Sequence, residues 1–157
     1  MSAILDSGNR RTFETGAVRD IQEGKGRCDL LPLRPIYDML RDGVLYDINL
    51  FKSSGDPSCL SEALCEFASG YDDLYTMLLE VSVHFEQGAK KYGENNWQKG
   101  IPVHCYIDSA IRHYFKFKRG DEDERHDRAF VWNLLCAIWT CHEMPELNEY
   151  KVEAESR

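Results

Sequence analysis

Apolar side chains recur every three or four residues over most of the chain, which is the spacing of amphipathic helices. The clearest stripe predicts a helix over residues 71–93, and others predict helices over 29–43, over 103–119, and from within 121–127 to about His142. Four main helices with short connections and few strand signals predict an all-α helical bundle. The stripes consist of Leu74, Leu78, Val81 and Phe85; Leu30, Leu33, Tyr37 and Leu40; Tyr106, Ala110, His113 and Phe117; and Phe130, Leu134, Ile138 and Cys141.

The pattern is weakest over residues 44–70. Residues 44–51 fit a strand or an irregular loop, 53–57 have turn chemistry, and a short helix is predicted over 58–68. Residues near the start have little periodicity and several glycines, which favours a mobile arm. The expected organisation is a flexible N-terminal arm over 1–26, a single all-α domain over 27–143 with 44–70 as a variable insert, and a polar C-terminal tail over 144–157.

Composition narrows the classes of function. The 157 residues fit one domain, and Lys and Arg number 19 against 27 Asp and Glu, a net charge of −8. This balance argues against binding polymeric nucleic acid but permits a small phosphorylated ligand. No apolar run approaches the ~20 residues of a membrane span, and the start lacks an apolar signal segment, so we expect a cytoplasmic protein without a membrane partner. The six cysteines have no zinc spacing and are expected to be free thiols.

The predicted helix over 71–93 carries Glu80, His84 and Glu86 among apolar residues. Glu80 and His84 share a helix face, and Glu86 lies on the opposite flank of the stripe. A carboxylate beside a core stripe can point between helices and bind a hard cation. The alternative is an exposed flank with a weak ion pair between Glu86 and Lys90, and the spacing alone favours this alternative.

A second acidic cluster covers residues 121–127. Glu124 and Asp127 are three positions apart and project from one helix face, as two carboxylates of a Mg²⁺ site would. Acidic residues in a first turn can equally cap a helix. His126 and Asp127 also form the doublet of HD hydrolases, but those enzymes need a later Asp, and Asp127 is the last one in this chain.

Cations and aromatic residues gather after the acidic helix. Lys90 supplies a charge for phosphate, Tyr92 and Trp97 offer stacking faces for a base, and Asn96 can bond to a base edge. Trp97 could equally close the end of the bundle.

A histidine interrupts the apolar stripe of the predicted helix over 103–119. His113 has Lys116 and other cations as sequence neighbours, which suits contact with a phosphate or a base. A core histidine that bonds to a nearby oxygen is the alternative.

These residues resemble a phage-associated family named for the N-terminal domain of dATP/dGTP diphosphohydrolases. The resemblance covers about residues 12–142, except for 44–70. The motifs that carry it are Phe13–Asp20, Gly24–Arg27, Asp29–Pro32, Gly88–Gly93, Asn96–Trp97, Lys99–Pro102, Asp108–Ala110, Arg112–His113, Arg119–Gly120, Asp123–Glu124, His126 and Trp132–Asn133.

The resemblance implies a relation to MazG-like enzymes, which cleave nucleoside triphosphates to monophosphate and pyrophosphate. Those enzymes carry an E-E-x-x-E helix and a later E-x-x-D pair. Residues 124–127 fit the second element, whereas the first is reduced to Glu80 and Glu86. It also implies a homo-oligomer, a dimer or a tetramer, in the host cytoplasm if a phage encodes the chain.

We therefore expect a Mg²⁺-dependent hydrolase, with Mn²⁺ as an alternative cofactor, that converts a purine dNTP to dNMP and pyrophosphate. The alternative function is a non-catalytic phage protein that sequesters a nucleotide or a cyclic or signalling nucleotide. In the hydrolase, Glu86 and Glu124 would be catalytic. The metal ligands would be Glu80, Glu86, Glu124 and Asp127, and the substrate-binding residues Lys90, Tyr92, Asn96, Trp97, His113 and Lys116.

Overall fold

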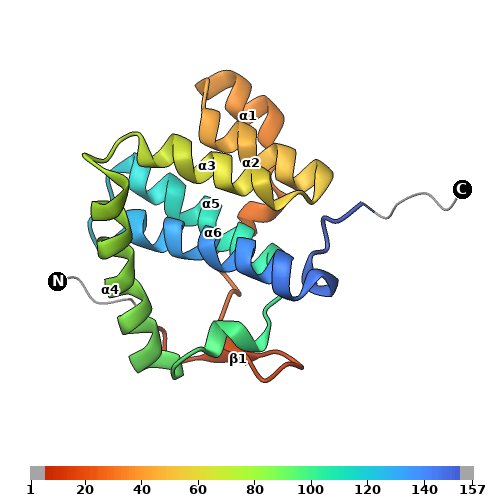
Figure 1. Ribbon diagram of the computed structural model, residues 1–157, viewed down its shortest axis with the longest axis vertical. Helices are drawn as coiled ribbons and strands as arrows, with labels where there is room; N and C mark the ends of the chain where they lie inside the picture. The colour runs from red at the N-terminus through yellow and green to blue at the C-terminus, as the bar shows by residue number, and fades with distance from the viewer. Residues whose placement is uncertain (1–5, 153–157) are drawn as a thin grey trace, which may run out of the picture.

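The computed structural model describes residues 6–152, within which six α-helices form a bundle beside a small hairpin (Figure 1). Helices α5 (Val103–Arg119) and α6 (His126–Glu143) pack against each other at the centre. Helix α6 also packs against α3 (Pro57–Ala68) and α4 (Leu74–Tyr92). The fold is all-α, which confirms the class predicted from the periodicity.

Two helices precede α3 in the chain, α1 (Leu33–Leu40) and α2 (Gly43–Ser54). The expectation of a strand or loop over 44–51 is wrong, because α2 covers it. Gly43 resembles a helix stop in the sequence, yet it begins α2, and Asp42 caps this helix by accepting a hydrogen bond from the Leu45 amide at 3.0 Å. One face of α2 is buried in the core: Val44, Leu45, Ile48 and Phe51.

Aspartates also start the next two helices. Asp56 accepts from the Ser58 amide at 2.9 Å, and Asp73 accepts from the Thr76 amide at 2.6 Å, so each satisfies a donor that the first turn leaves open. Helix α4 is apolar on two sides, and the side against the core carries Met77 and Val81. The prediction that the stripe with Leu74 and Leu78 faces the core is therefore wrong at these two exposed residues.

The hairpin consists of the antiparallel strands β1 (Arg10–Thr12) and β2 (Val18–Asp20), with Arg10 opposite Asp20. Ala17 in the turn is fully buried, and the Thr15 hydroxyl donates a hydrogen bond to the Gly100 carbonyl. The described part of the predicted arm thus lies against the loop that connects α4 to α5.

Short 3-10 helices complete the structure: η1 (Cys28–Leu30), η2 (Asn96–Lys99) and η3 (Pro145–Leu147). The Asp108 carboxylate on α5 accepts the Cys28 amide at 2.6 Å and so attaches η1 to the bundle. No helix in the part of the chain that the structure describes is long and apolar enough to cross a membrane. All six cysteines are free thiols, as predicted.

Candidate functional site

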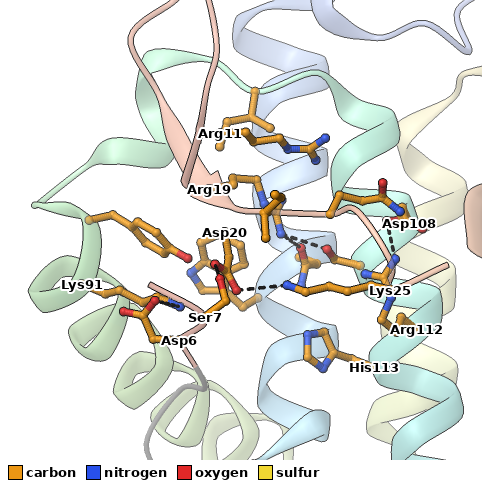
Figure 2. A pocket seen from close by; sticks show the side chains of 18 of the residues that line it. Asp6, Ser7, Arg11, Arg19, Asp20, Lys25, Lys91, Asp108, Arg112 and His113 are labelled. Atoms are coloured by element: carbon orange, nitrogen blue, oxygen red, sulfur yellow. Dashed lines mark hydrogen bonds and ion pairs between the residues drawn. The ribbon is translucent and has the colours of Figure 1, made fainter. Parts of the chain in front are cut away.

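A cavity of about 490 Å³ lies between the N-terminal segment, α4, α5 and α6 (Figure 2). Its volume is within the usual range for small-molecule sites. Cations outnumber acids on its wall, although the whole chain carries a net charge of −8. This local excess of positive charge favours an anionic ligand. The cations are Arg11, Arg19, Lys25, Lys91, Arg112 and Lys116, and the acids are Asp6, Asp20, Asp108 and Glu124.

Arg19 on β2 enters the cavity between α5 and α6. Its Nη2 donates to Ser109 Oγ at 3.0 Å and to Asn133 Oδ1 at 3.1 Å. Its guanidinium carbon lies 5.1 Å from the ring centre of Tyr106 and 5.7 Å from that of Trp132. These contacts fix the guanidinium through neutral groups, and no carboxylate among residues 6–152 forms an ion pair with it, so its charge remains available to a ligand.

Three arginines on the cavity wall hold buried N–H groups that have no hydrogen-bond partner among the described residues. The atoms are Arg11 Nε, Arg19 Nη1 and Arg112 Nε. Buried donors are nearly always satisfied, and arginine donors pair best with phosphate and carboxylate oxygens. Three arginines with unsatisfied donors therefore line one cavity, which is compatible with a ligand that has several anionic oxygens.

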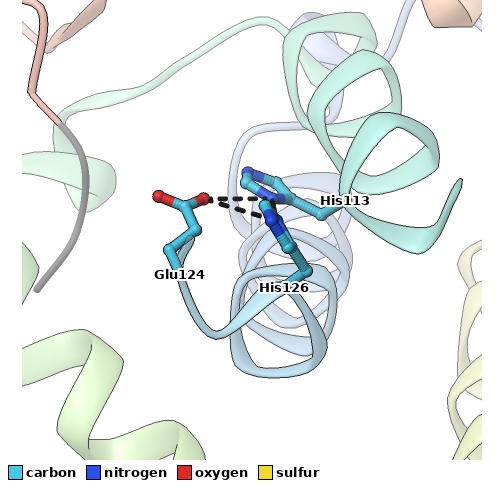
Figure 3. A group of neighbouring side chains, drawn as sticks. All are labelled: His113, Glu124 and His126. Carbon is cyan, nitrogen blue, oxygen red and sulfur yellow. Dashed lines mark hydrogen bonds and ion pairs between the residues drawn. The ribbon is translucent and has the colours of Figure 1, made fainter. Parts of the chain in front are cut away.

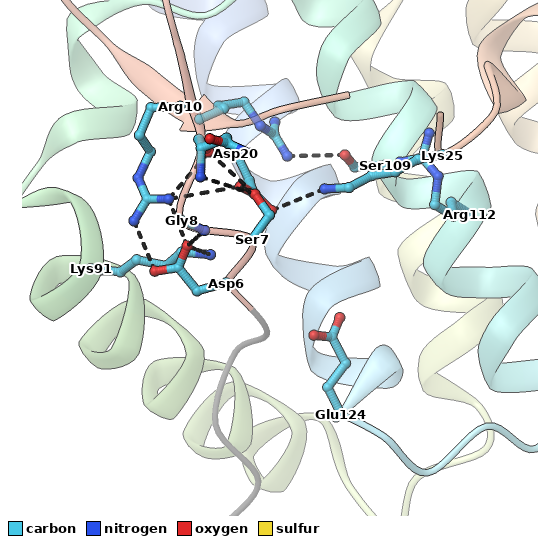
Figure 4. A network of polar contacts seen from close by, with 12 residues as sticks. Asp6, Ser7, Gly8, Arg10, Asp20, Lys25, Lys91, Ser109, Arg112 and Glu124 are labelled. Carbon is cyan, nitrogen blue, oxygen red and sulfur yellow. Dashed lines mark hydrogen bonds and ion pairs between the residues drawn. The ribbon is translucent and has the colours of Figure 1, made fainter. Parts of the chain in front are cut away.

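Ion pairs hold the N-terminal segment over one side of the cavity (Figure 4). Lys25 Nζ lies 3.0 Å from Asp20 Oδ2, and Lys91 Nζ on α4 lies 3.8 Å from Asp6 Oδ1. Arg10 Nη1 lies 2.6 Å from the same Asp6 oxygen. The Asp6 contacts connect the residues before β1, and Arg10 on β1, to α4, whereas Lys25 joins the residues after β2 to β2. The segment therefore forms part of the cavity wall.

Asn96 fixes the hairpin at the edge of the cavity. Its Oδ1 accepts the Val18 amide at 2.8 Å, and its Nδ2 donates to the Val18 carbonyl at 2.7 Å. Asn96 is buried, and both ends of its amide are engaged by β2. The structure therefore shows Asn96 as a clamp on β2, which differs from the predicted contact with a base edge.

Two histidines and a glutamate meet where the loop between α5 and α6 reaches the cavity (Figure 3). His113 Nδ1 lies 2.9 Å from His126 Nδ1 and 3.2 Å from Glu124 Oε1. His126 is almost fully buried, and its Nε2 lies 2.6 Å from Asp123 Oδ1. This cluster is one of two groups in the described residues whose atoms are close enough to share a metal ion.

Burial keeps the histidines of the cavity wall neutral. Burial, together with the nearby positive charges of Arg128 and Arg19, lowers the pKa of His84 to about 4. Burial, together with the adjacent His126, lowers the pKa of His113 well below its usual value. Both imidazoles are thus uncharged near neutral pH and can act as acceptors or ligands.

The cavity brings together five of the residues selected from the sequence: Tyr92, Asn96, His113, Lys116 and Glu124. Lys90 and Trp97 do not line it. Lys90 is exposed 4.0 Å from Glu86, and Trp97 packs edge-on against Phe85 and Trp139. Glu86 is itself exposed and lies at a second, adjacent cavity with Trp97.

The predicted ligands Glu80 and Asp127 contact arginines. Arg125 Nη1 lies 3.2 Å from Glu80 Oε2, and its Nη2 lies 2.8 Å from Asp127 Oδ2, which also accepts from the Tyr71 hydroxyl at 2.6 Å. Burial alone would raise the pKa of Asp127, but the hydrogen bonds from Arg125 and Tyr71 lower it to about 2. Arginine already balances the charge that a metal ion would need at these two carboxylates.

Sequence reasoning missed the functional candidates that come from distant elements. Arg19, Ser109 and Asn133 belong to motifs of the family resemblance, but nothing in their local pattern placed them beside one another. His126 stands in the sequence as a doublet with Asp127 and as one of the family motifs, and neither feature predicts that its imidazole faces His113.

The protein is thus all-α, with one cavity whose wall carries more cations than acids. Residues 74–150 match the model of the family described as dATP/dGTP diphosphohydrolase, N-terminal. This match confirms, over residues 74–150, the resemblance found in the sequence. No curated protein and no solved structure gives a significant match to the chain.

Proposed function

We propose that the protein binds a purine deoxynucleoside triphosphate in the main cavity and hydrolyses it to the monophosphate and pyrophosphate. The observation that carries the proposal is the set of three buried arginine N–H groups around one cavity in an acidic chain. The matched family, described as a dATP/dGTP diphosphohydrolase, supports this choice of anion and reaction.

The arrangement of the wall suggests how the substrate lies. Arg19, Arg112 and Lys116 line the cavity from β2 and α5 and would bind the phosphate oxygens. The ion pair between Arg112 Nη2 and Asp108 Oδ2, at 2.6 Å, engages only this end of the guanidinium. Tyr92 and Trp132 line the same cavity and offer aromatic faces for a purine. Phosphates near α5 would place the α-phosphorus on the side of the cavity that carries Glu124.

Hydrolysis of this kind uses a divalent ion, which lowers the pKa of a bound water and balances the charge on the transferring phosphoryl group. A Mg²⁺ or Mn²⁺ ion is commonly held by one or two carboxylates together with substrate phosphates. Glu124 supplies a carboxylate at the cavity wall and fits this donor set. Glu80 and Asp127 fit it less well because arginine contacts them.

Residues of the cavity wall would have separate roles in the reaction. The oxygen of a water molecule forms a bond to the α-phosphorus while the bond from this phosphorus to the bridging oxygen breaks, and pyrophosphate leaves. Glu124 orients the attacking water, whose proton passes to the solvent in the cavity, and the neutral His113 imidazole lies beside Glu124. Arg112 and Lys116 stabilise the negative charge that grows on the leaving pyrophosphate.

A second function is sequestration of a nucleotide without hydrolysis. The observation that favours it is the pairing of Glu80 and Asp127 with Arg125, which leaves fewer acids for metal ions than MazG-like enzymes use. The same arginine donors would bind the ligand in both cases, so measurement of product distinguishes the two functions.

The test is incubation of the protein with each dNTP in Mg²⁺ or Mn²⁺, with separation of nucleotides by chromatography and an assay for pyrophosphate. We expect dATP or dGTP to yield dNMP and pyrophosphate in equal amounts. Tight binding without product would support sequestration. Absence of binding to every nucleotide would overturn both functions.

A further inference from the structure

The cluster of His113, Glu124 and His126 has the composition and spacing of a transition-metal site (Figure 3). We propose that these three side chains bind one divalent first-row ion of the Mn²⁺, Fe²⁺, Co²⁺ and Zn²⁺ class through two imidazole nitrogens and one carboxylate oxygen. The inference deepens the proposed function, because Glu124 belongs to both. It is tested without nucleotide, so the two can fail separately.

The distances within the cluster match neighbouring ligands of one ion. Atoms that bind a single ion at about 2.1 Å lie about 3.0 Å apart in octahedral and about 3.4 Å apart in tetrahedral geometry. The Nδ1 atoms of His113 and His126 are 2.9 Å apart. Glu124 Oε1 is 3.2 Å from the first and 3.6 Å from the second. The three atoms therefore outline one face of a coordination shell.

Asp123 prepares His126 for this role. A carboxylate can only accept, so the hydrogen bond between Asp123 Oδ1 and His126 Nε2, at 2.6 Å, places the proton of a neutral imidazole on Nε2. The lone pair of His126 then lies on Nδ1, directed at His113 and Glu124. A carboxylate behind a ligating histidine is the usual outer contact of a metal site, because it fixes the tautomer and the ring orientation.

The remaining ligand can reach the required state without a large movement. His113 Nδ1 donates toward His126 Nδ1 in the ion-free cluster, and metal binding requires its proton on Nε2 instead. His113 lines the cavity, so water can exchange this proton, and no net proton is released. The open coordination positions would face the cavity that carries Arg112 and Lys116.

The two imidazoles determine the class of ion. Imidazole suits transition ions, whereas Mg²⁺ prefers oxygen ligands, so the site should discriminate between them. The second candidate group is formed by Asp121, Asp123 and His126. Arg119 Nε donates to Asp121 Oδ1 at 2.7 Å and already balances that carboxylate, which favours the first group.

The experiment uses the full chain, freed of metal with a chelator and then exchanged into chelator-free buffer. Mn²⁺ binding is followed by loss of the free-ion paramagnetic resonance signal, and Mg²⁺ is added as a competitor. We expect one Mn²⁺ to bind per chain. The dissociation constant of Mg²⁺, obtained from its competition with Mn²⁺, should be at least tenfold higher than that of Mn²⁺. Equal competition by the two ions, or no Mn²⁺ binding, would overturn the proposal.

Variants assign the ligands. His113→Gln and Glu124→Gln should each weaken Mn²⁺ binding by at least tenfold, and Asp123→Asn by about 10- to 100-fold. Asp121→Asn is the matched control and should leave binding unchanged. Loss of binding in Asp121→Asn with normal binding in His113→Gln would place the ion in the second group and contradict the proposal. Circular dichroism of each variant verifies the fold.

Discussion

Asn96 forms two reciprocal hydrogen bonds with the backbone of Val18, 78 positions earlier in the chain. This contact attaches β2, and with it Arg19, to the loop that follows α4. A single buried amide thus connects the stability of the hairpin to the geometry of the cavity.

Replacement of this amide should loosen the hairpin. Asn96→Leu removes both hydrogen bonds and leaves the Val18 groups without their partners, which should lower the free energy of unfolding by about 1–3 kcal/mol. Hydrogen exchange should accelerate at the amides of β2, and nucleotide affinity should fall because Arg19 is no longer held. Normal exchange at Val18 would contradict the role of the clamp. Asn49→Leu, at a position outside the cavity wall, is the control.

Arg19 should contribute a large part of the affinity for nucleotide. Arg19→Gln removes the charge while it retains a donor, and loss of a charged hydrogen bond of about 1.5–3 kcal/mol corresponds to roughly 10- to 100-fold weaker binding. Calorimetric titration with dATP or dGTP measures this change. Arg34→Gln on the exposed side of α1 should bind normally. Equal affinities of the two variants for the nucleotide would show that Arg19 does not bind it.

Glu124 and Glu80 should differ in their effect on catalysis. Glu124→Gln should abolish turnover and its dependence on the divalent ion, because this carboxylate lines the cavity. Glu80→Gln should retain the metal dependence, since Glu80 contacts Arg125 and Arg128 outside the cavity. Titration of activity with Mg²⁺ and Mn²⁺ compares them. If Glu80→Gln also loses the metal dependence, Glu80 is a metal ligand, as expected from the sequence.

His84 should make the protein less stable in mild acid. Burial lowers the pKa of His84 to about 4 in the folded state, whereas the unfolded chain takes up a proton near 6.5. The unfolded state therefore binds more protons between these values, and the free energy of unfolding should fall as the pH drops from 6.5 to 4, by up to about 3 kcal/mol. Urea denaturation should show a smaller decrease over this range for His84→Gln. Identical pH profiles would show that His84 is not responsible.

Gly55 should not tolerate a side chain. Its φ of +71° is strained for other residues, and a Cβ would lie 2.5 Å from the Lys151 Cα. Gly55→Ala should therefore destabilise the protein by more than about 1 kcal/mol. Gly88→Ala is the matched control, because it lies inside α4 with open space around it, and should stabilise by about 0.5–1 kcal/mol. Thermal melting measures both variants, and a higher melting temperature for Gly55→Ala would contradict the packing of the C-terminal segment.

Periodicity alone predicts the helices that have one apolar face. Residues 103–119 and the helix that ends near His142 were predicted closely, because their buried residues recur at the helical period and Gly120 ends the first of them. Local chemistry failed at Gly43, where the αL residue that ends α1 is Arg41 and Asp42 caps the next helix. It also failed on α4, where two faces are apolar and only contact with α6 decides which is buried.

The composition of the site depends on contacts between segments that are far apart in the chain. Arg19 meets Ser109 and Asn133, which lie 90 and 114 positions away, and His113 meets His126 across the connection between two helices. The sequence identified acids, cations and aromatic residues as candidates. Two of the acids, Glu80 and Asp127, form ion pairs with Arg125 and do not line the cavity, whereas Glu124 does. Periodicity indicates which face of a segment is buried. A binding site depends on the distances between segments, and these are determined by how the segments pack.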